Sequence, residues 1–279
     1  MITGKQFLKG MTAAIITVSS ISQAYAQQNQ TDSLEALLPQ KQGEERLDAL
    51  RTLADLTINM PQEKHYVKMY LEEARRQKNI EAEGYALSTL TSIYYMQFDS
   101  DSVFIFGEEA VSFNRKYKLY DDMFSAMYNI IRRYQWERQM LTALRRAEDA
   151  YAEAKELQDN ISMALVLSVM GNIFYGMEQF EEAIPCWTES IGLFEHDLPT
   201  RLPIIFGTYN FLAYLGRYMN QHQETLRYAD SMQVVTDRIY AANPAYNIQT
   251  HRFRAEYHRA IAYAELRQPA QSLEAIRRA

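Results

Sequence analysis

Residues 164–191 read ALVLSVMGNIFYGMEQFEEAIPCWTESI, and the spacing of small and aromatic side chains in this stretch decides the fold. Gly171 lies three residues before Phe174, and Ala183 lies four residues before Trp187. Small residues let two antiparallel helices approach closely, while the rings fill the space around the crossing. The stretch therefore predicts a pair of helices joined by a short turn.

The same spacing recurs along the chain, as in a repeat architecture. Moving upstream, matches to the stretch occur after 40, another 40 and a further 36 residues; moving downstream, they occur after 42 and then 47 residues. Ala143 and Ala147, for example, take the positions of Ala183 and Trp187. We therefore expect a repeat domain over residues 44–279. Its helix pairs are predicted at residues 44–80, 84–118, 121–158, 161–195, 203–240 and 248–279.

This pattern resembles the tetratricopeptide repeat (TPR), and the resemblance is carried by Gly171, Phe174, Ala183, Trp187 and Ser190. It implies an all-α fold, a right-handed α-solenoid of about six TPR-like antiparallel helix pairs. The intervals exceed the about 34 residues of the strict motif, so longer helices or loops are expected. The ten glycines and seven prolines in 279 residues also favour long helices.

The first 26 residues have the features of an export signal. Lys5 and Lys9 precede an apolar stretch from Met11 to Ile21, which is too short to span a bilayer. Ala24-Tyr25-Ala26 then supplies the small-x-small pattern that a signal peptidase accepts. We therefore expect a signal peptide over residues 1–26, cleavage after Ala26 and a periplasmic location.

Residues 27–43 connect the predicted signal to the repeats. Their polar composition and the sequence around Leu34 predict a short helix that stops at Pro39, because the residue before a proline is disfavoured in the helical region. We expect a polar lead-in outside the repeat domain.

Charge and cysteine content limit the partners and the covalent chemistry. The formal net charge is −6, and it becomes −8 when Lys5 and Lys9 leave with the signal. An acidic chain is poorly suited to nucleic acid or to an anionic membrane surface. Cys186 is the one cysteine in the sequence, which excludes an internal disulfide.

No pattern of catalytic or metal-binding residues stands out. The glycines form no phosphate-binding loop. His251 and His258 are seven residues apart, which on a helix separates them by about 10 Å and prevents both from binding one ion. Cys186 follows Pro185 near a predicted helix start, where its pKa would fall somewhat, but no base accompanies it. We expect no enzyme activity, no cofactor and no metal site.

The first helices of stacked pairs line one side of a helical solenoid, so the repeat offsets predict a binding groove. The residues at these offsets combine rings with amide and guanidinium donors, which suits a protein or peptide partner. The predicted groove residues are Tyr85, Ser92, Tyr95, Tyr128, Arg132, Gln135, Asn172, Tyr175, Asn210, Tyr214 and Arg217. The alternative, that many tyrosines pack between repeats, stays open. The rings expected in the core are Tyr94, Tyr134, Phe174 and Trp187.

The last predicted pair ends with Leu273 and Ile276, which no following helix covers. Because repeat arrays normally close with a polar-faced cap, we expect either dimerisation at this end or a longer natural chain. A membrane contact is expected only through such a missing C-terminal segment. The oligomeric state stays open.

The signal, residues 32–39 and residues 44–50 resemble exported sensor regions of bacterial TPR-containing signalling proteins. In that family the repeats precede a membrane helix and a cytoplasmic kinase or DNA-binding part. The resemblance implies a periplasmic sensory or protein-interaction region that binds a peptide or protein. The alternative interpretation is a free periplasmic scaffold or assembly factor with no signalling output.

Overall fold

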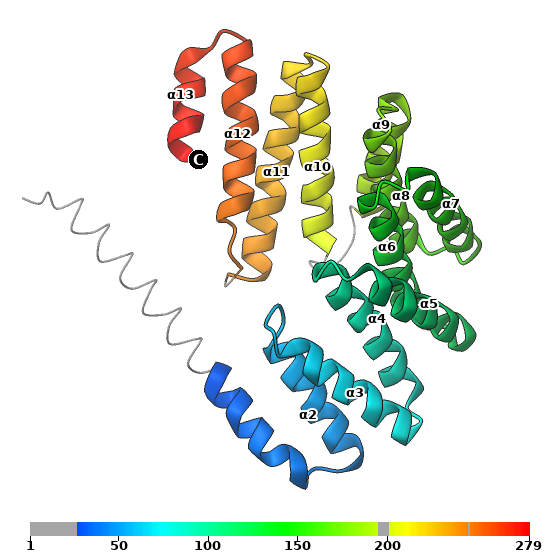
Figure 1. Ribbon diagram of the computed structural model, residues 1–279. Coiled ribbons are helices and arrows are strands. Elements are labelled where there is room, and N and C mark those ends of the chain that lie inside the picture. Colours follow the sequence, from blue (N-terminus) through cyan, green and yellow to red (C-terminus); the bar gives the residue numbers. More distant parts are fainter. Residues whose placement is uncertain (1–26, 195–200, 245) are drawn as a thin grey trace, which may run out of the picture. The chain divides into compact units, whose positions relative to one another are not determined.

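The computed structural model describes residues 27–194, 201–244 and 246–279 of the 279-residue chain. The predicted signal peptide at residues 1–26 lies outside this part. Helices make up nearly all of the described residues, and no strand occurs among them (Figure 1). The predicted fold class, an all-α repeat fold of about six antiparallel helix pairs, is confirmed.

The helices follow one another with short connections. In chain order they are a helix over residues 27–37, η1 (Leu38–Gln40), α2 (Gly43–Leu56), α3 (Glu63–Gln77), α4 (Ile80–Met96), α5 (Ser100–Tyr117), α6 (Tyr120–Trp136), α7 (Met140–Glu156), α8 (Asn160–Gly176), α9 (Phe180–Phe194), α10 (Leu202–Tyr218), α11 (His222–Ala242), α12 (Gln249–Glu265) and α13 (Pro269–Arg278). The helices α4, α6, α8, α10 and α12 begin at residues 80, 120, 160, 202 and 249. These are the intervals of the sequence repeat.

The chain divides into two compact units, and the division falls within α6, between Ala126 and Met127. In unit 1, the helices α2 to α5 pack in order, each against the next. In unit 2, α8 packs against α7 and α9, and α10 to α13 pack in order, as Figure 1 shows in yellow to red. Helix α10 also contacts α8 and α12, the first helices of the neighbouring pairs.

The turns inside the pairs from α4–α5 onward share one backbone conformation. Each turn has a middle residue with a left-handed φ, and these residues are Phe98, Arg138, Glu178, Asn220 and Arg267. The next residue donates its N–H back across the helix end, as Gln179 does to the Phe174 carbonyl at 2.9 Å. Such caps satisfy the last carbonyls of the helix. Glycine is the usual residue at this position, so its absence here removes the ordinary sequence signal for the turn.

The close contact between α8 and α9 depends on Gly171. A methyl group added at Gly171 would overlap the Trp187 indole ring. Trp187 is fully buried, and Leu212 and Leu215 of α10 pack in the same cluster. The missing side chain at Gly171 therefore lets one large ring join two consecutive pairs.

The segment before α2 differs from its prediction as a polar lead-in with a short helix. The helix over residues 27–37 is longer than expected, and Pro39 lies inside η1. The Gln27 side-chain amide donates to the Leu56 carbonyl, and the Tyr66 hydroxyl donates to Glu35. The segment therefore packs as part of unit 1.

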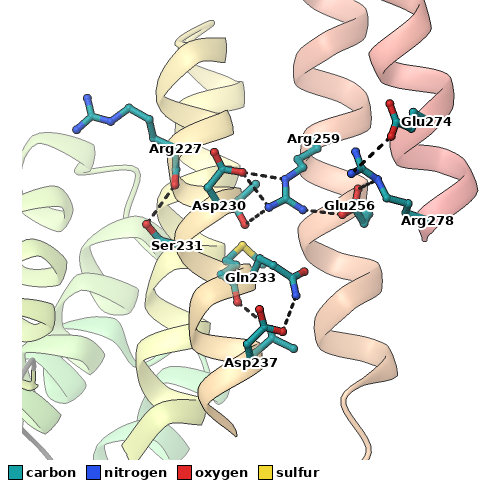
Figure 2. A network of polar contacts seen from close by, with 12 residues as sticks. Arg227, Asp230, Ser231, Gln233, Asp237, Glu256, Arg259, Glu274 and Arg278 are labelled. Atoms are coloured by element: carbon teal, nitrogen blue, oxygen red, sulfur yellow. Dashed lines mark hydrogen bonds and ion pairs between the residues drawn. The ribbon is translucent and has the colours of Figure 1, made fainter. Parts of the chain in front are cut away.

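A polar network joins the last three helices (Figure 2). Glu256 of α12 is only 6% exposed, and its Oε1 accepts a hydrogen bond from Arg259 Nη1 at 2.6 Å. Arg278 of α13 lies 3.4 Å from the other carboxylate oxygen of Glu256. Arg259 also pairs with Asp230 of α11 at 2.8 Å. A buried carboxylate with two cationic partners thus holds α13 against α12 and α11.

We predict that Gly171→Ala destabilises the protein by about 1–3 kcal/mol, because the added methyl displaces the Trp187 ring. The control is Gly207→Ala in α10, where an added Cβ meets nothing within 4 Å. That change should stabilise the protein by up to about 1 kcal/mol through helix propensity. Urea unfolding measures both, and equal effects of the two variants would contradict the packing argument.

We predict that Glu256→Gln destabilises the protein by about 1–3 kcal/mol, because two arginines lose a buried charged partner. Glu274→Gln is the matched control, since Glu274 is 66% exposed and lies 3.9 Å from Arg278. Exposed pairs of this kind contribute about 0–1 kcal/mol, so the control should unfold nearly as the parent does. Thermal unfolding of both variants provides the comparison.

Candidate functional site

A pocket of about 350 Å³ lies in unit 2, among side chains of α6, α8 and α10 and of the turn that ends α6. Its lining residues are Arg132, Gln135, Trp136, Arg138, Met140, Asn172 and Phe211. Three of them, Arg132, Gln135 and Asn172, belong to the groove predicted from the repeat offsets. The structure therefore brings predicted residues from two different repeats into one pocket.

Asn172 is held in a fixed orientation by the core. The Trp187 indole Nε1 donates a hydrogen bond to Asn172 Oδ1 at 3.0 Å. An asparagine side chain has one acceptor oxygen and two N–H donors. Because the oxygen is already used, the amide nitrogen is the group of Asn172 that can donate to a bound molecule.

Aromatic rings form the base of the pocket. The Phe211 ring stacks on Trp187 with centroids 5.5 Å apart and planes 14° apart. Tyr175 lies 5.8 Å from Phe211 and 5.9 Å from Trp187, and it also contacts Phe180. The rings of Tyr175, Phe180, Trp187 and Phe211 therefore form one packed cluster. Phe211 is the ring of this cluster that lines the pocket.

The opposite side of the pocket offers apolar surface and positive charge. Trp136 is 59% exposed at the end of α6. The Arg132 guanidinium lies 5.1 Å from the centre of the Tyr128 ring on the same helix. A cation held over a ring keeps a defined position.

The predicted residues of α10 are divided between the core and the surface. Asn210 is 7% exposed, and its Oδ1 lies 3.2 Å from Nε2 of the buried His258 on α12. Asn210 was expected in the groove, but it joins two helices instead. The Arg217 guanidinium lies 5.7 Å from the Tyr214 ring and 5.1 Å from the Tyr257 ring.

Tyr175 also differs from its expected environment, because its ring packs in the aromatic cluster. In unit 1, Tyr95 is 7% exposed and belongs to the core. Ser92 lines a second pocket of about 600 Å³ with Met60, Ile93 and Met96 among its neighbours. Tyr85 lies under the Arg51 guanidinium at 4.5 Å.

Sequence reasoning missed Trp136, Phe211 and Tyr257. Tyr257 could have been found, because the 47-residue shift between the last two pairs places it at the position of Asn210. Trp136 ends α6 at the position that Gly176 occupies in α8, so the repeat carries no conserved side-chain type there. Phe211 follows Asn210 directly, and only the packing of Trp187 reveals its role.

Cys186 is partly buried and His258 is fully buried. Burial, with the nearby Glu189 carboxylate, raises the pKa of Cys186 to about 11. The expected lowering by a helix start is wrong, because Cys186 lies in the middle of α9. Burial and the charges of Arg217 and Arg254 lower the pKa of His258 to about 4. His258 is therefore a neutral imidazole at neutral pH.

Two features are absent from the described part of the chain. No group of three or more His, Cys, Asp or Glu side chains lies close enough there to hold a metal ion. None of its helices combines the length and the apolar character that a membrane span requires.

Comparison with known proteins gives matches in structure. No protein-family model matches the sequence, and no curated protein matches it. BtubC (BKLC) from P. vanneervenii is 16% identical with a TM-score of 0.59, over 77% of this chain and 87% of that one. A putative kinesin light chain with TPR-like repeats from Podosopora anserina is 17% identical with a TM-score of 0.50, over 69% and 91%. NprR, solved with its cognate peptide NprX, is 15% identical with a TM-score of 0.55, over 98% and 84%. At such identities the likeness concerns the fold alone.

Proposed function

We propose that this chain, a helical repeat protein with the fold of TPR proteins, is a binding module for a peptide or an extended protein segment. The observation that carries the proposal is the pocket among α6, α8 and α10. It combines an exposed indole, a guanidinium and two side-chain amides over an aromatic base. These groups match the alternating apolar and polar features of an extended peptide.

Each part of the pocket suits a different part of such a ligand. The Asn172 amide nitrogen and Gln135 can bond backbone carbonyl and N–H groups of a peptide. Trp136 and Phe211 can cover an apolar side chain, because large rings bury much surface at low entropic cost. A volume of about 350 Å³ lies near the lower end of small-ligand pockets, about 300–1,000 Å³. It accommodates a side chain and its adjacent backbone.

The fold comparison supports a peptide over other ligands. NprR was solved in complex with a peptide, and its fold matches over 98% of this chain. Helical repeat proteins present side chains of successive repeats to one extended partner. The pocket described here draws its residues from consecutive repeats in the same way.

The cellular context that we propose rests on the sequence. The signal pattern over residues 1–26 supports export to the periplasm, and the resemblance to bacterial sensor regions supports a sensory role. The alternative is a periplasmic scaffold without signalling output. A sensory role requires that ligand binding changes the output of an attached part, whereas a scaffold requires binding alone.

The binding proposal is tested with dodecapeptides selected from a random library on the immobilised protein. We predict that Trp136→Ala weakens binding of these peptides by about tenfold or more, because central aromatic residues contribute most to such interfaces. The matched control is Leu141→Ala, which removes another exposed apolar side chain, 71% exposed, that does not line the pocket. Both variants should keep the thermal stability of the parent.

Arg132→Gln provides an independent arm of the same experiment, with binding again expected to fall. The proposal is contradicted if the peptides bind Trp136→Ala and Arg132→Gln as tightly as they bind the parent. So would a library from which no peptide is enriched.

The export proposal predicts that the protein expressed in a bacterial host appears in the periplasmic fraction with Gln27 as its first residue. N-terminal sequencing of the fractionated protein provides the measurement. Replacing Ala24 and Ala26 by larger residues should leave the leader attached, because the signal peptidase requires small residues there. A protein that stays in the cytoplasm with Met1 intact would contradict export.

A further inference from the structure

A second group of side chains lies on α10 and α12, outside the pocket described above. Arg217 and Tyr214 of α10 meet Tyr257 and His258 of α12, and Arg254 lies close enough to His258 to affect its charge. The ring centroids of Tyr214 and His258 are 4.6 Å apart, and those of Tyr257 and His258 are 5.8 Å apart. The cluster therefore combines two cations with two tyrosine rings and an imidazole.

Arg217 lacks a counter-ion in this cluster. Its Nε and Nη1 atoms are buried and make no hydrogen bond to any residue of the described chain. Buried N–H donors are nearly always paired in folded proteins, and charged donors without an acceptor are especially unfavourable. The Arg217 guanidinium therefore lacks a paired acceptor and a negative charge beside it.

His258, which lies beside Arg217, has an unpartnered ring nitrogen of the opposite kind, an acceptor without a donor. The side chain is fully buried, and its Nε2 lies 3.2 Å from Asn210 Oδ1. Because that oxygen is an acceptor, Nε2 carries the ring hydrogen. Nδ1 is left without a partner among the described residues. The positive charges of Arg217 and Arg254, together with burial, keep this ring neutral.

A planar anion would complete the cluster. A carboxylate accepts hydrogen bonds from a guanidinium through two oxygens in one plane. The Tyr214 and Tyr257 rings flank the guanidinium and are 40% and 38% exposed. Rotation of such partly exposed rings opens a path to the covered nitrogens.

The position of Arg217 relates this cluster to the pocket. Phe211 lines the pocket and lies six residues before Arg217 on α10, which is about 9 Å along the helix at about 1.5 Å per residue. An extended peptide covers that distance in about three residues. Six residues also turn the helix by about 240° beyond a full turn, so the two side chains leave α10 on different sides and a peptide that contacts both needs more than three residues.

We propose that Arg217, between Tyr214 and Tyr257, binds a carboxylate of the peptide ligand. This inference rests on the proposed function and specifies the ligand as an acidic peptide. The whole chain has a formal charge of −6, so long-range attraction does not favour acidic peptides. A preference for them must come from a local site.

The test uses two pools of dodecapeptides that are identical except that every glutamate in the first is glutamine in the second. We expect the parent protein to bind the acidic pool about tenfold more tightly, since hydrogen bonds to charged groups are the stronger class. Arg217→Gln should abolish this preference. Arg217→Lys should reduce it, because an ammonium lacks the planar arrangement of donors.

Arg227→Gln is the matched control, because it removes the same charge from the exposed surface of α11, where the arginine side chain is 77% exposed. It should retain the preference of the parent. Thermal unfolding verifies that each variant is folded, and Arg217→Lys carries the test if Arg217→Gln does not fold.

Each other outcome has a defined meaning. Equal binding of the two pools by the parent overturns the carboxylate site and leaves the peptide-binding proposal intact. Absence of binding by either pool overturns the proposed function itself. If inorganic phosphate displaces the acidic peptides more strongly than glutarate does, the choice of a carboxylate is overturned. Competition by glutarate without a preference between pools overturns the choice of a peptide.

Discussion

The contact between Gly171 and Trp187 is the constraint on which the described site depends. Because α8 has no side chain at Gly171, the indole of α9 lies directly against the helix and is fully buried. From that position Trp187 bonds Asn172 through Nε1 and stacks on Phe211. The contact between Gly171 and Trp187 thereby orients the Asn172 amide and the Phe211 ring, which both line the pocket.

The sequence predicts the helix pairs well because small residues recur at fixed offsets. A small residue at such an offset indicates that two helices pack closely there. Ala143 and Ala183 are both fully buried. The groove was harder to predict, since an offset specifies a helix face and not its neighbours. Tyr95 is buried, Tyr175 packs in the aromatic cluster, and Asn210 contacts the buried His258, so these three side chains do not line the pocket.

The remaining differences arise from contacts between residues that are far apart in the sequence. The helix over residues 27–37 extends beyond its predicted length, because Gln27 and Glu35 find partners in unit 1 that no local pattern indicates. Cys186 lies where burial, and not a helix end, controls its pKa. His258, which the sequence analysis rejected as a metal ligand, buries its ring beside Arg217. In each case a long-range contact outweighs the local signal.

The two tryptophans of the chain allow a direct measurement. Trp136 is 59% exposed beside the pocket, and Trp187 is fully buried beneath it. Fluorescence emission is therefore measured while a selected dodecapeptide saturates the protein. If the peptide occupies the pocket, the emission of Trp136 shifts to the blue as its ring leaves water, and the shift is lost in Trp136→Phe. Saturation with no change in emission would place the ligand elsewhere and contradict the account.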